Sequence, residues 1–153
     1  GASPVKSVTL LQGAFSHFAF ADALPHDRAR GGALKGMVSR VDGPITISHS
    51  TFDSAVGTLY PLASIVSQDD ASAADDLLFR WGAMGHDGAQ GAEAAGLPLG
   101  RVGQAYPFGR AKIVNLDGNA IIREGGPPAG AHGDIFHPQL AWATLAAAGV
   151  VSA

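Results

Sequence analysis

Three short runs of apolar, often β-branched residues stand out along the chain, at residues 5–11, 45–49 and 112–116. The first run is continuous rather than alternating in polarity, and it ends at Gln12-Gly13. A continuous apolar run is typical of a strand that is covered on both faces of a parallel sheet. We therefore predict three strands at these positions.

Apolar residues at helical spacing predict helices between and after these runs. A short amphipathic helix is expected over residues 33–41, and a second over 54–66, which Pro61 should kink or shorten. The last helix is predicted over 138–148, because proline favours the first position of a helix and glycine favours its end.

The remaining segments predict loops and turns. Residues 68–76 are acidic and read as an exposed connection, and 77–81 form a short apolar patch. Residues 82–103 are dominated by Gly, Ala and Gln, which predicts a long loop with at most one helical turn. A turn at 117–119 predicts an extended hairpin partner over 120–123.

Alternation of strands and helices predicts an α/β protein with a mostly parallel, doubly wound sheet. Three or four strands make a thin sheet, and the first begins close to the start of the chain. An unpaired strand edge is a liability that proteins usually cover. We therefore expect residues 1–153 to form a partial domain, one half of a larger sheet.

Composition narrows the classes of function. Ten Lys and Arg against thirteen Asp and Glu give a net charge of -3, and 15% of residues are charged. This balance offers no basic surface for nucleic acid or an anionic membrane. The absence of cysteine excludes disulfides and thiol nucleophiles. No stretch approaches the about 20 apolar residues of a membrane helix, and no signal peptide is visible, so we expect a cytoplasmic protein.

Candidate chemistry lies beyond the predicted strands, where functional groups of open parallel sheets gather. Asp53 follows the second strand, and His132 lies in a Gly- and Pro-rich loop after the third. Such a pair suits a Ser-His-Asp relay, in which the carboxylate orients the imidazole and stabilises its positive charge. Further candidates for the substrate pocket, or for support of the pair, are Ser16, His17, Phe18, His49, Asp134 and His137.

Three stretches also carry a family resemblance: VKSVTLLQGAFSHFAFAD, GPITISHSTFDSAVGTLYPLAS and GAHGDIFHPQLAWATLAAAG. In order, they resemble the sixth strand, the seventh strand with its acid, and the loop and helix that present the histidine of a serine α/β-hydrolase. The resemblance implies that Asp53 is the relay acid and His132 the general base. It further implies hydrolysis of an ester, amide or other acyl bond in a small molecule, without a cofactor.

One departure from this family is large, because the nucleophile elbow G-x-S-x-G is absent. Ser16, in GAFSH, lacks the second glycine and follows the wrong strand. The resemblance therefore implies that the serine and the oxyanion-hole loop belong to an N-terminal half, on a second chain or an upstream segment. The aromatic segment 15–20 and the loop 82–103 are expected to line an apolar substrate pocket.

Each candidate also has a structural interpretation. Asp53 can cap the helix that follows it, and the two roles are compatible. His132 can be an ordinary surface histidine, and His137 fits the start of the last helix. Asp134 can support its turn, while His17 and His49 can have structural or supporting roles near the strand ends.

Two other functions stay open. His132, Asp134 and His137 form the pattern H-x-D-x-x-H, whose nitrogen and oxygen atoms could bind the metal of a hydrolase. Its loop context and Pro138 argue against a single ligand-bearing helix face. The missing elbow also permits a hydrolase-like module that only binds.

Overall fold

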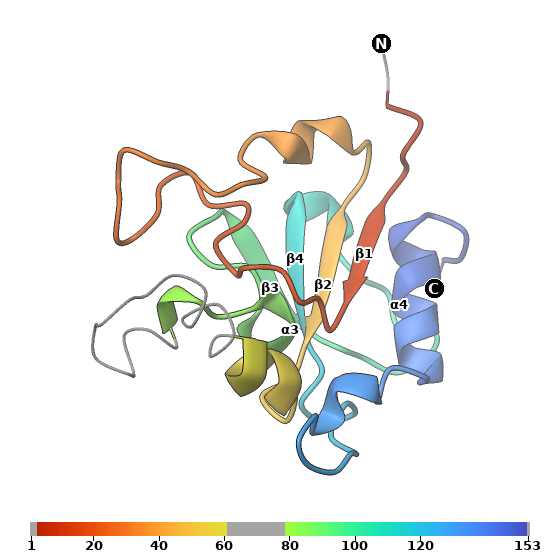
Figure 1. Ribbon diagram of the computed structural model, residues 1–153. Helices are drawn as coiled ribbons and strands as arrows, with labels where there is room; N and C mark the ends of the chain where they lie inside the picture. The colour runs from red at the N-terminus through yellow and green to blue at the C-terminus, as the bar shows by residue number, and fades with distance from the viewer. Residues whose placement is uncertain (1–2, 61–78, 153) are drawn as a thin grey trace.

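A computed structural model describes residues 3–60 and 79–152 of the chain. Four strands form one sheet in the order β1-β2-β4-β3, and every neighbouring pair is parallel. Figure 1 shows them side by side, with helix α4 flanking the sheet next to β1. The strands are β1 (Val8–Leu11), β2 (Ile45–His49), β3 (Ala94–Pro98) and β4 (Ile113–Asp117). The predicted α/β class with a parallel sheet is thus confirmed.

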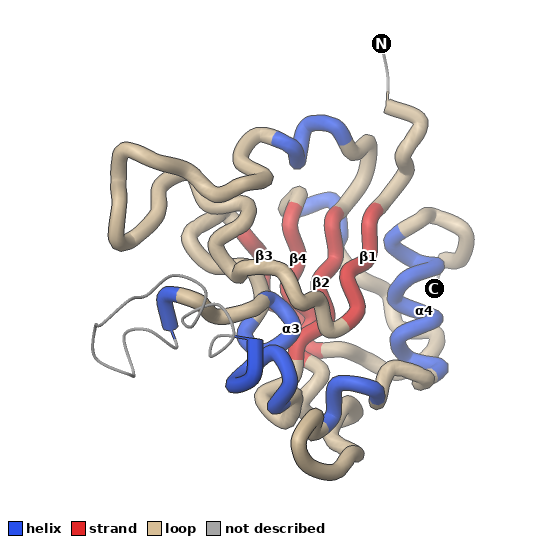
Figure 2. Tube along the Cα trace, viewed as in Figure 1, coloured by secondary structure: helices blue, strands red, loops and turns tan. Residues whose placement is uncertain are grey.

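The helices of the described residues are short, and loops form much of the remaining chain (Figure 2). Their bounds are η1 (Met37–Arg40), η2 (Ala55–Leu59), α3 (Met84–Asp87), η3 (Phe108–Arg110), η4 (Ala131–Gly133) and α4 (Pro138–Ala147). The elements η1, η3 and η4 are 3₁₀ helices, and η2 is a π-helix. None of these helices is long and apolar enough to cross a membrane, among the residues that the structure describes.

Both faces of the sheet are covered, which explains the apolar character of its central strands. On one face, Ile45 and Ile47 of β2 pack with Phe20 and Met84. On the other face, Val114 and Leu116 of β4 belong to one buried cluster with Leu140 and Ala143 of α4. Burial of these side chains supplies most of the driving force for the fold.

The prediction that residues 82–103 form a loop is wrong, because they contain β3. This strand pairs with β4 from Ala94 opposite Ile113 to Pro98 opposite Asp117. Its sequence, AAGLP, holds residues that are depleted in strands, so the pattern gave no strand signal. As an edge strand it also tolerates partial exposure. The single helical turn allowed for this segment is α3.

The predicted hairpin partner over residues 120–123 is also wrong. The amides of Ile121 and Ile122 both donate to the Gly118 carbonyl, at 2.8 and 2.7 Å, so the chain turns instead of pairing. Ile122 is fully buried against the α4 face of the sheet. Its apolar character thus reflects a buried turn and not a strand.

One predicted helix is shorter than expected, whereas the described part of the next agrees with its prediction. Within 33–41, only Met37–Arg40 is helical, as a 3₁₀ helix that follows Gly36 with its φ of 78°. Within 54–66, all of the described residues, 54–60, are helical, and the π-helix η2 covers Ala55–Leu59. Residues 61–66 lie outside the described residues, as do 68–76 and the first part of the patch 77–81. The last helix agrees with its prediction, with Pro138 first and Gly149 following at φ 70°.

The edge strand β3 offers a test of the fold through Gly96. A Cβ at this position meets no atom within 4 Å. Gly96→Val should raise the free energy of unfolding by about 0.5–1 kcal/mol, because valine favours a strand and glycine weakens one. Chemical denaturation measures the change, and Gly109→Val, with equally open space in η3, is the control. An equal or larger gain in the control would contradict the assignment of β3.

Candidate functional site

The structure brings Asp53 and His132 together beyond the carboxyl ends of β2 and β4. Nδ1 of His132 lies 2.9 Å from Oδ2 of Asp53. The carboxylate is fully buried, whereas 41% of the imidazole surface is exposed. A buried acid thus contacts a histidine whose side chain is partly exposed.

Asp53 is held in the turn that leads from β2 into η2. Its amide donates to the Ser50 carbonyl at 3.1 Å, and its Oδ1 accepts a hydrogen bond from the Val56 amide at 3.2 Å. An aspartate that caps the start of a helix accepts the same hydrogen bond, from the backbone amide three residues later. One carboxylate therefore caps with Oδ1 and bonds the histidine with Oδ2, so the two interpretations of Asp53 coexist.

The loop after β4 reaches Asp53 through backbone hydrogen bonds to the residues before and after this aspartate. The Ala131 amide donates to the Phe52 carbonyl at 2.9 Å, and the Ala55 amide donates to the Ala129 carbonyl at 3.1 Å. Gly130 forms an isolated bridge with Asp53 between them, at φ 60° and ψ −138°. Because a Cβ on Gly130 would lie 2.3 Å from the Phe52 oxygen, this contact requires glycine.

The hydrogen bond also determines which imidazole nitrogen is available for chemistry. An ionised carboxylate can only accept, so neutral His132 must carry its proton on Nδ1. Its Nε2 then has a free lone pair, and no hydrogen bond joins Nε2 to another residue in the described part of the chain. The pair can therefore take up a proton at Nε2 and stabilise the resulting charge through Asp53.

A third side chain, which the sequence analysis missed, also contacts the acid. The side-chain nitrogen of Gln12, Nε2, donates to Oδ2 of Asp53 at 3.0 Å. Gln12 follows β1 directly, and this position beyond a strand is the feature of the sequence that could have marked it as a site residue. A glutamine has no titratable group and belongs to no relay motif, and it therefore attracted no functional interpretation.

Asp134 and His137 form a separate pair that anchors the loop. Nε2 of His137 lies 2.7 Å from Oδ1 of Asp134, whose Oδ2 accepts the amides of Arg123 and Glu124. Burial raises the pKa of Asp134, but the bonds from Glu124, Arg123 and His137 outweigh it and hold that pKa below its usual value. His137 is the N-cap residue of α4. Both residues thus tie the loop to the start of the last helix, as their structural interpretations predicted.

His17 is fully buried and bonds Asp87 of α3 through Nδ1, at 2.8 Å to the nearer oxygen. Phe18 and Phe79 make edge contacts with its ring. Asp87 was not singled out from the sequence. No described contact connects this second His–Asp pair to His132, and Phe18 is itself buried in the core.

Ser16 lies apart from the Asp53–His132 pair. It bridges Ala83 and lines a hollow of about 420 Å³ together with Phe18 and Trp81. Most of the aromatic segment 15–20 is buried in the core and is not open to a ligand. The expectation that it lines an apolar substrate pocket together with residues 82–103 therefore stays a prediction. A hollow of about 280 Å³ does lie between η2 and α3, where His86 and Asp87 contribute to its wall.

The H-x-D-x-x-H residues do not converge. His132 faces Asp53, whereas His137 and Asp134 face each other. Within residues 3–60 and 79–152, no group of three or more His, Asp or Glu side chains is arranged to hold a metal ion.

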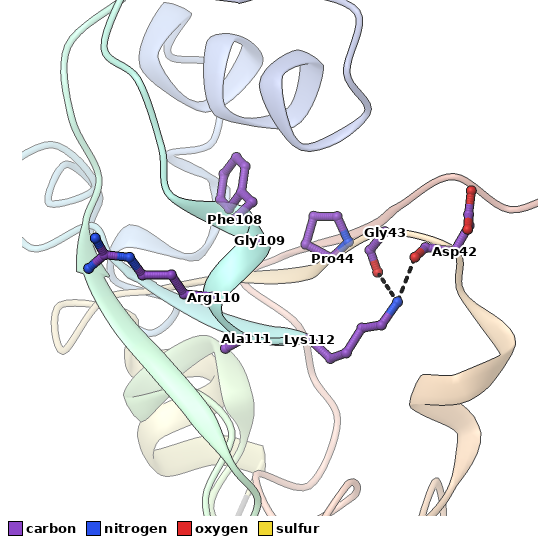
Figure 3. A pocket seen from close by; sticks show the side chains of 8 residues that line it. All are labelled: Asp42, Gly43, Pro44, Phe108, Gly109, Arg110, Ala111 and Lys112. Carbon is purple, nitrogen blue, oxygen red and sulfur yellow. Dashed lines mark hydrogen bonds between the residues drawn. The ribbon is translucent and has the colours of Figure 1, made fainter.

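Another hollow, of about 440 Å³, lies at the opposite end of the sheet. It is bounded by Pro44 and Lys112, which precede β2 and β4. Figure 3 shows Lys112 extending to the carbonyls of Asp42 and Gly43, which accept its ammonium hydrogens at 2.5 and 3.4 Å. This lysine therefore fastens two chain segments and is remote from the Asp53–His132 pair.

No family model, curated protein or solved structure matches the chain.

Gly130 provides a test of how the loop holds His132. Gly130→Ala should lower the free energy of unfolding by about 1 kcal/mol or more, because its Cβ collides with backbone and its φ is unfavourable for alanine. Gly133→Ala, on the other side of His132, meets open space and should change stability little. Denaturant titration compares the two variants, and equal effects would contradict the described loop conformation.

His49 predicts a dependence of stability on pH. Burial lowers the pKa of His49, although the carboxylates of Asp117 and Asp87 act to raise it. The unfolded chain thus binds this proton more readily, so stability should fall as pH drops below 6.5, the ordinary value for histidine. His49→Gln should reduce the loss of stability measured between about pH 8 and about pH 5. An unchanged loss would show that His49 does not cause it.

Proposed function

We propose that this chain supplies the acid and the base of a serine hydrolase that acts on an ester, amide or other acyl bond. The observation that carries the proposal is the hydrogen bond between buried Asp53 and partly exposed His132. Burying the charge of a carboxylate is costly unless hydrogen-bonding partners stabilise it. A histidine with no function beyond the surface does not require a buried carboxylate beside it. The arrangement matches what a catalytic relay requires of its acid and its base.

In the proposed reaction, Nε2 of His132 takes the proton from a serine hydroxyl as that oxygen attacks the acyl carbon. The resulting imidazolium returns this proton to the leaving group, and the acyl group remains on the serine. His132 then takes a proton from water as the water oxygen attacks the acyl carbon. The imidazolium gives this proton to the serine oxygen as that oxygen leaves, which releases the acid and restores the serine hydroxyl and neutral His132. Asp53 keeps Nδ1 protonated and stabilises the imidazolium at each stage.

The serine is proposed to come from an N-terminal half outside these 153 residues. The proposal is supported by β1, which pairs with β2 on one side and with no other strand among the described residues. Beside the end of β1, Leu11, Phe136 and Leu140 line an apolar hollow, and Phe136 is 92% exposed. A further parallel strand at this edge would extend the sheet and bring its following loop toward His132.

The alternative is a hydrolase-like module that binds without catalysis. The observation in its favour is the absence of a G-x-S-x-G elbow from the sequence. The two functions differ in one property, which is the presence of an activated serine in the assembled protein.

Fluorophosphonate labelling tests the proposal, because this probe reacts with activated serines. The tagged chain is captured from the cells that produce it, labelled, and mapped by mass spectrometry. We expect the label on a serine outside the 153 residues. Asp53→Asn and His132→Gln should slow labelling on the order of 10³–10⁴-fold, since the relay no longer activates the serine.

His137→Gln is the matched control, because His137 also bonds a carboxylate but lies apart from the Asp53–His132 pair. Its labelling should resemble that of the wild type. The proposal is wrong if the label maps to a serine within this chain. It is also wrong if no captured polypeptide is labelled while other serine hydrolases in the same extract are.

A further inference from the structure

The side chain of Gln12 reaches the acid of the candidate site from the end of β1. Gln12 is buried, and its Nε2 donates to Oδ2 of Asp53 at 3.0 Å and to the Gly85 carbonyl at 3.1 Å. The same Oδ2 accepts the bond from His132. Among the described residues, Gln12 and His132 are thus the two side chains that bond this carboxylate.

The orientation of the Gln12 amide is fixed at both ends. The Gly85 carbonyl and an ionised Asp53 can only accept hydrogen bonds, so the amide nitrogen must face them. At the other end, Oε1 accepts a bond from Oγ of Ser48 at 3.3 Å. The Ser48 oxygen in turn accepts the backbone amide of Gln12 at 3.2 Å. A flipped amide would lose the bonds to Asp53 and to the Gly85 carbonyl.

The backbone around Gln12 is also unusual in ways that serve this placement. Gln12 has a φ of 47°, the one positive φ of a non-glycine residue in the described part of the chain. Residues with side chains adopt this conformation at a cost, and such costs concentrate at functional sites. A Cβ on Gly85 would lie 2.6 Å from the Gln12 carbonyl carbon, so the glycine lets α3 approach closely.

We propose that Gln12 is a positioning residue that sets the rotation of the Asp53 carboxylate. An aspartate χ2 angle is broad, so one bond does not define the carboxylate plane. The Val56 amide holds Oδ1 and Gln12 holds Oδ2, and together they turn Oδ2 toward Nδ1 of His132. The catalytic meaning of this role rests on the proposed function, whereas the hydrogen bond can be measured without it.

Proton NMR of the 153-residue chain tests the role through the Nδ1 proton of His132. In the wild type we expect a low-field resonance, as is usual for a strong bond to a carboxylate. In Gln12→Met, which removes the donor, the resonance should move upfield and its exchange with water should accelerate on the order of tenfold. Gln90→Met is the matched control, because Gln90 also donates one side-chain bond, to the Asp87 carbonyl at 2.8 Å.

A second variant distinguishes the loss of the Gln12 hydrogen bond from misfolding. Gln12→Gly suits the positive φ and should fold, yet its His132 resonance should move upfield and exchange faster in the same way. The positioning role is wrong if both Gln12 variants keep the wild-type resonance and exchange rate, or if the wild type lacks the resonance. An upfield shift with faster exchange in both variants supports the positioning role even when no serine is labelled, in which case the hydrolase proposal alone fails.

Discussion

The site depends on the hydrogen bonds that the buried carboxylate of Asp53 accepts, because they join three parts of the chain. It accepts hydrogen bonds from Val56 in η2, from Gln12 beyond β1 and from His132 in the loop after β4. A buried charge without such partners would strongly destabilise the fold. The hydrogen bonds of one carboxylate therefore link the segments that follow β1, β2 and β4.

The parallel sheet makes this convergence possible. β1, β2 and β4 are neighbours, so the segments that leave their carboxyl ends emerge on the same side. Gly130 then lets the loop pair closely with the chain around Asp53, and Gly85 lets α3 pack against Gln12. The exposed Nε2 edge of His132 results from this packing: the sheet buries the acid, while the loop leaves the base at the surface.

The sequence predicted the parts of the fold that carry a strong hydrophobic pattern. β2 and α4 agree with their predicted ranges because their apolar residues have clear spacing and end signals. β3 was missed because Ala, Gly and Pro give no strand pattern. Asp53 and His132 were found since their chemistry is recognisable at strand ends. Gln12 and Asp87 were not, because their importance comes from neighbours that tertiary packing brings to them.

The role proposed for Asp53 is to hold His132 as a base with its Nε2 lone pair free. Nitrogen-15 NMR of the imidazole measures this directly, at a pH where the ring is neutral. We expect neutral His132 to carry its proton on Nδ1 and not on Nε2, and Asp53→Asn should disturb this tautomer preference. A neutral ring that carries its proton on Nε2 in the wild type would contradict the account.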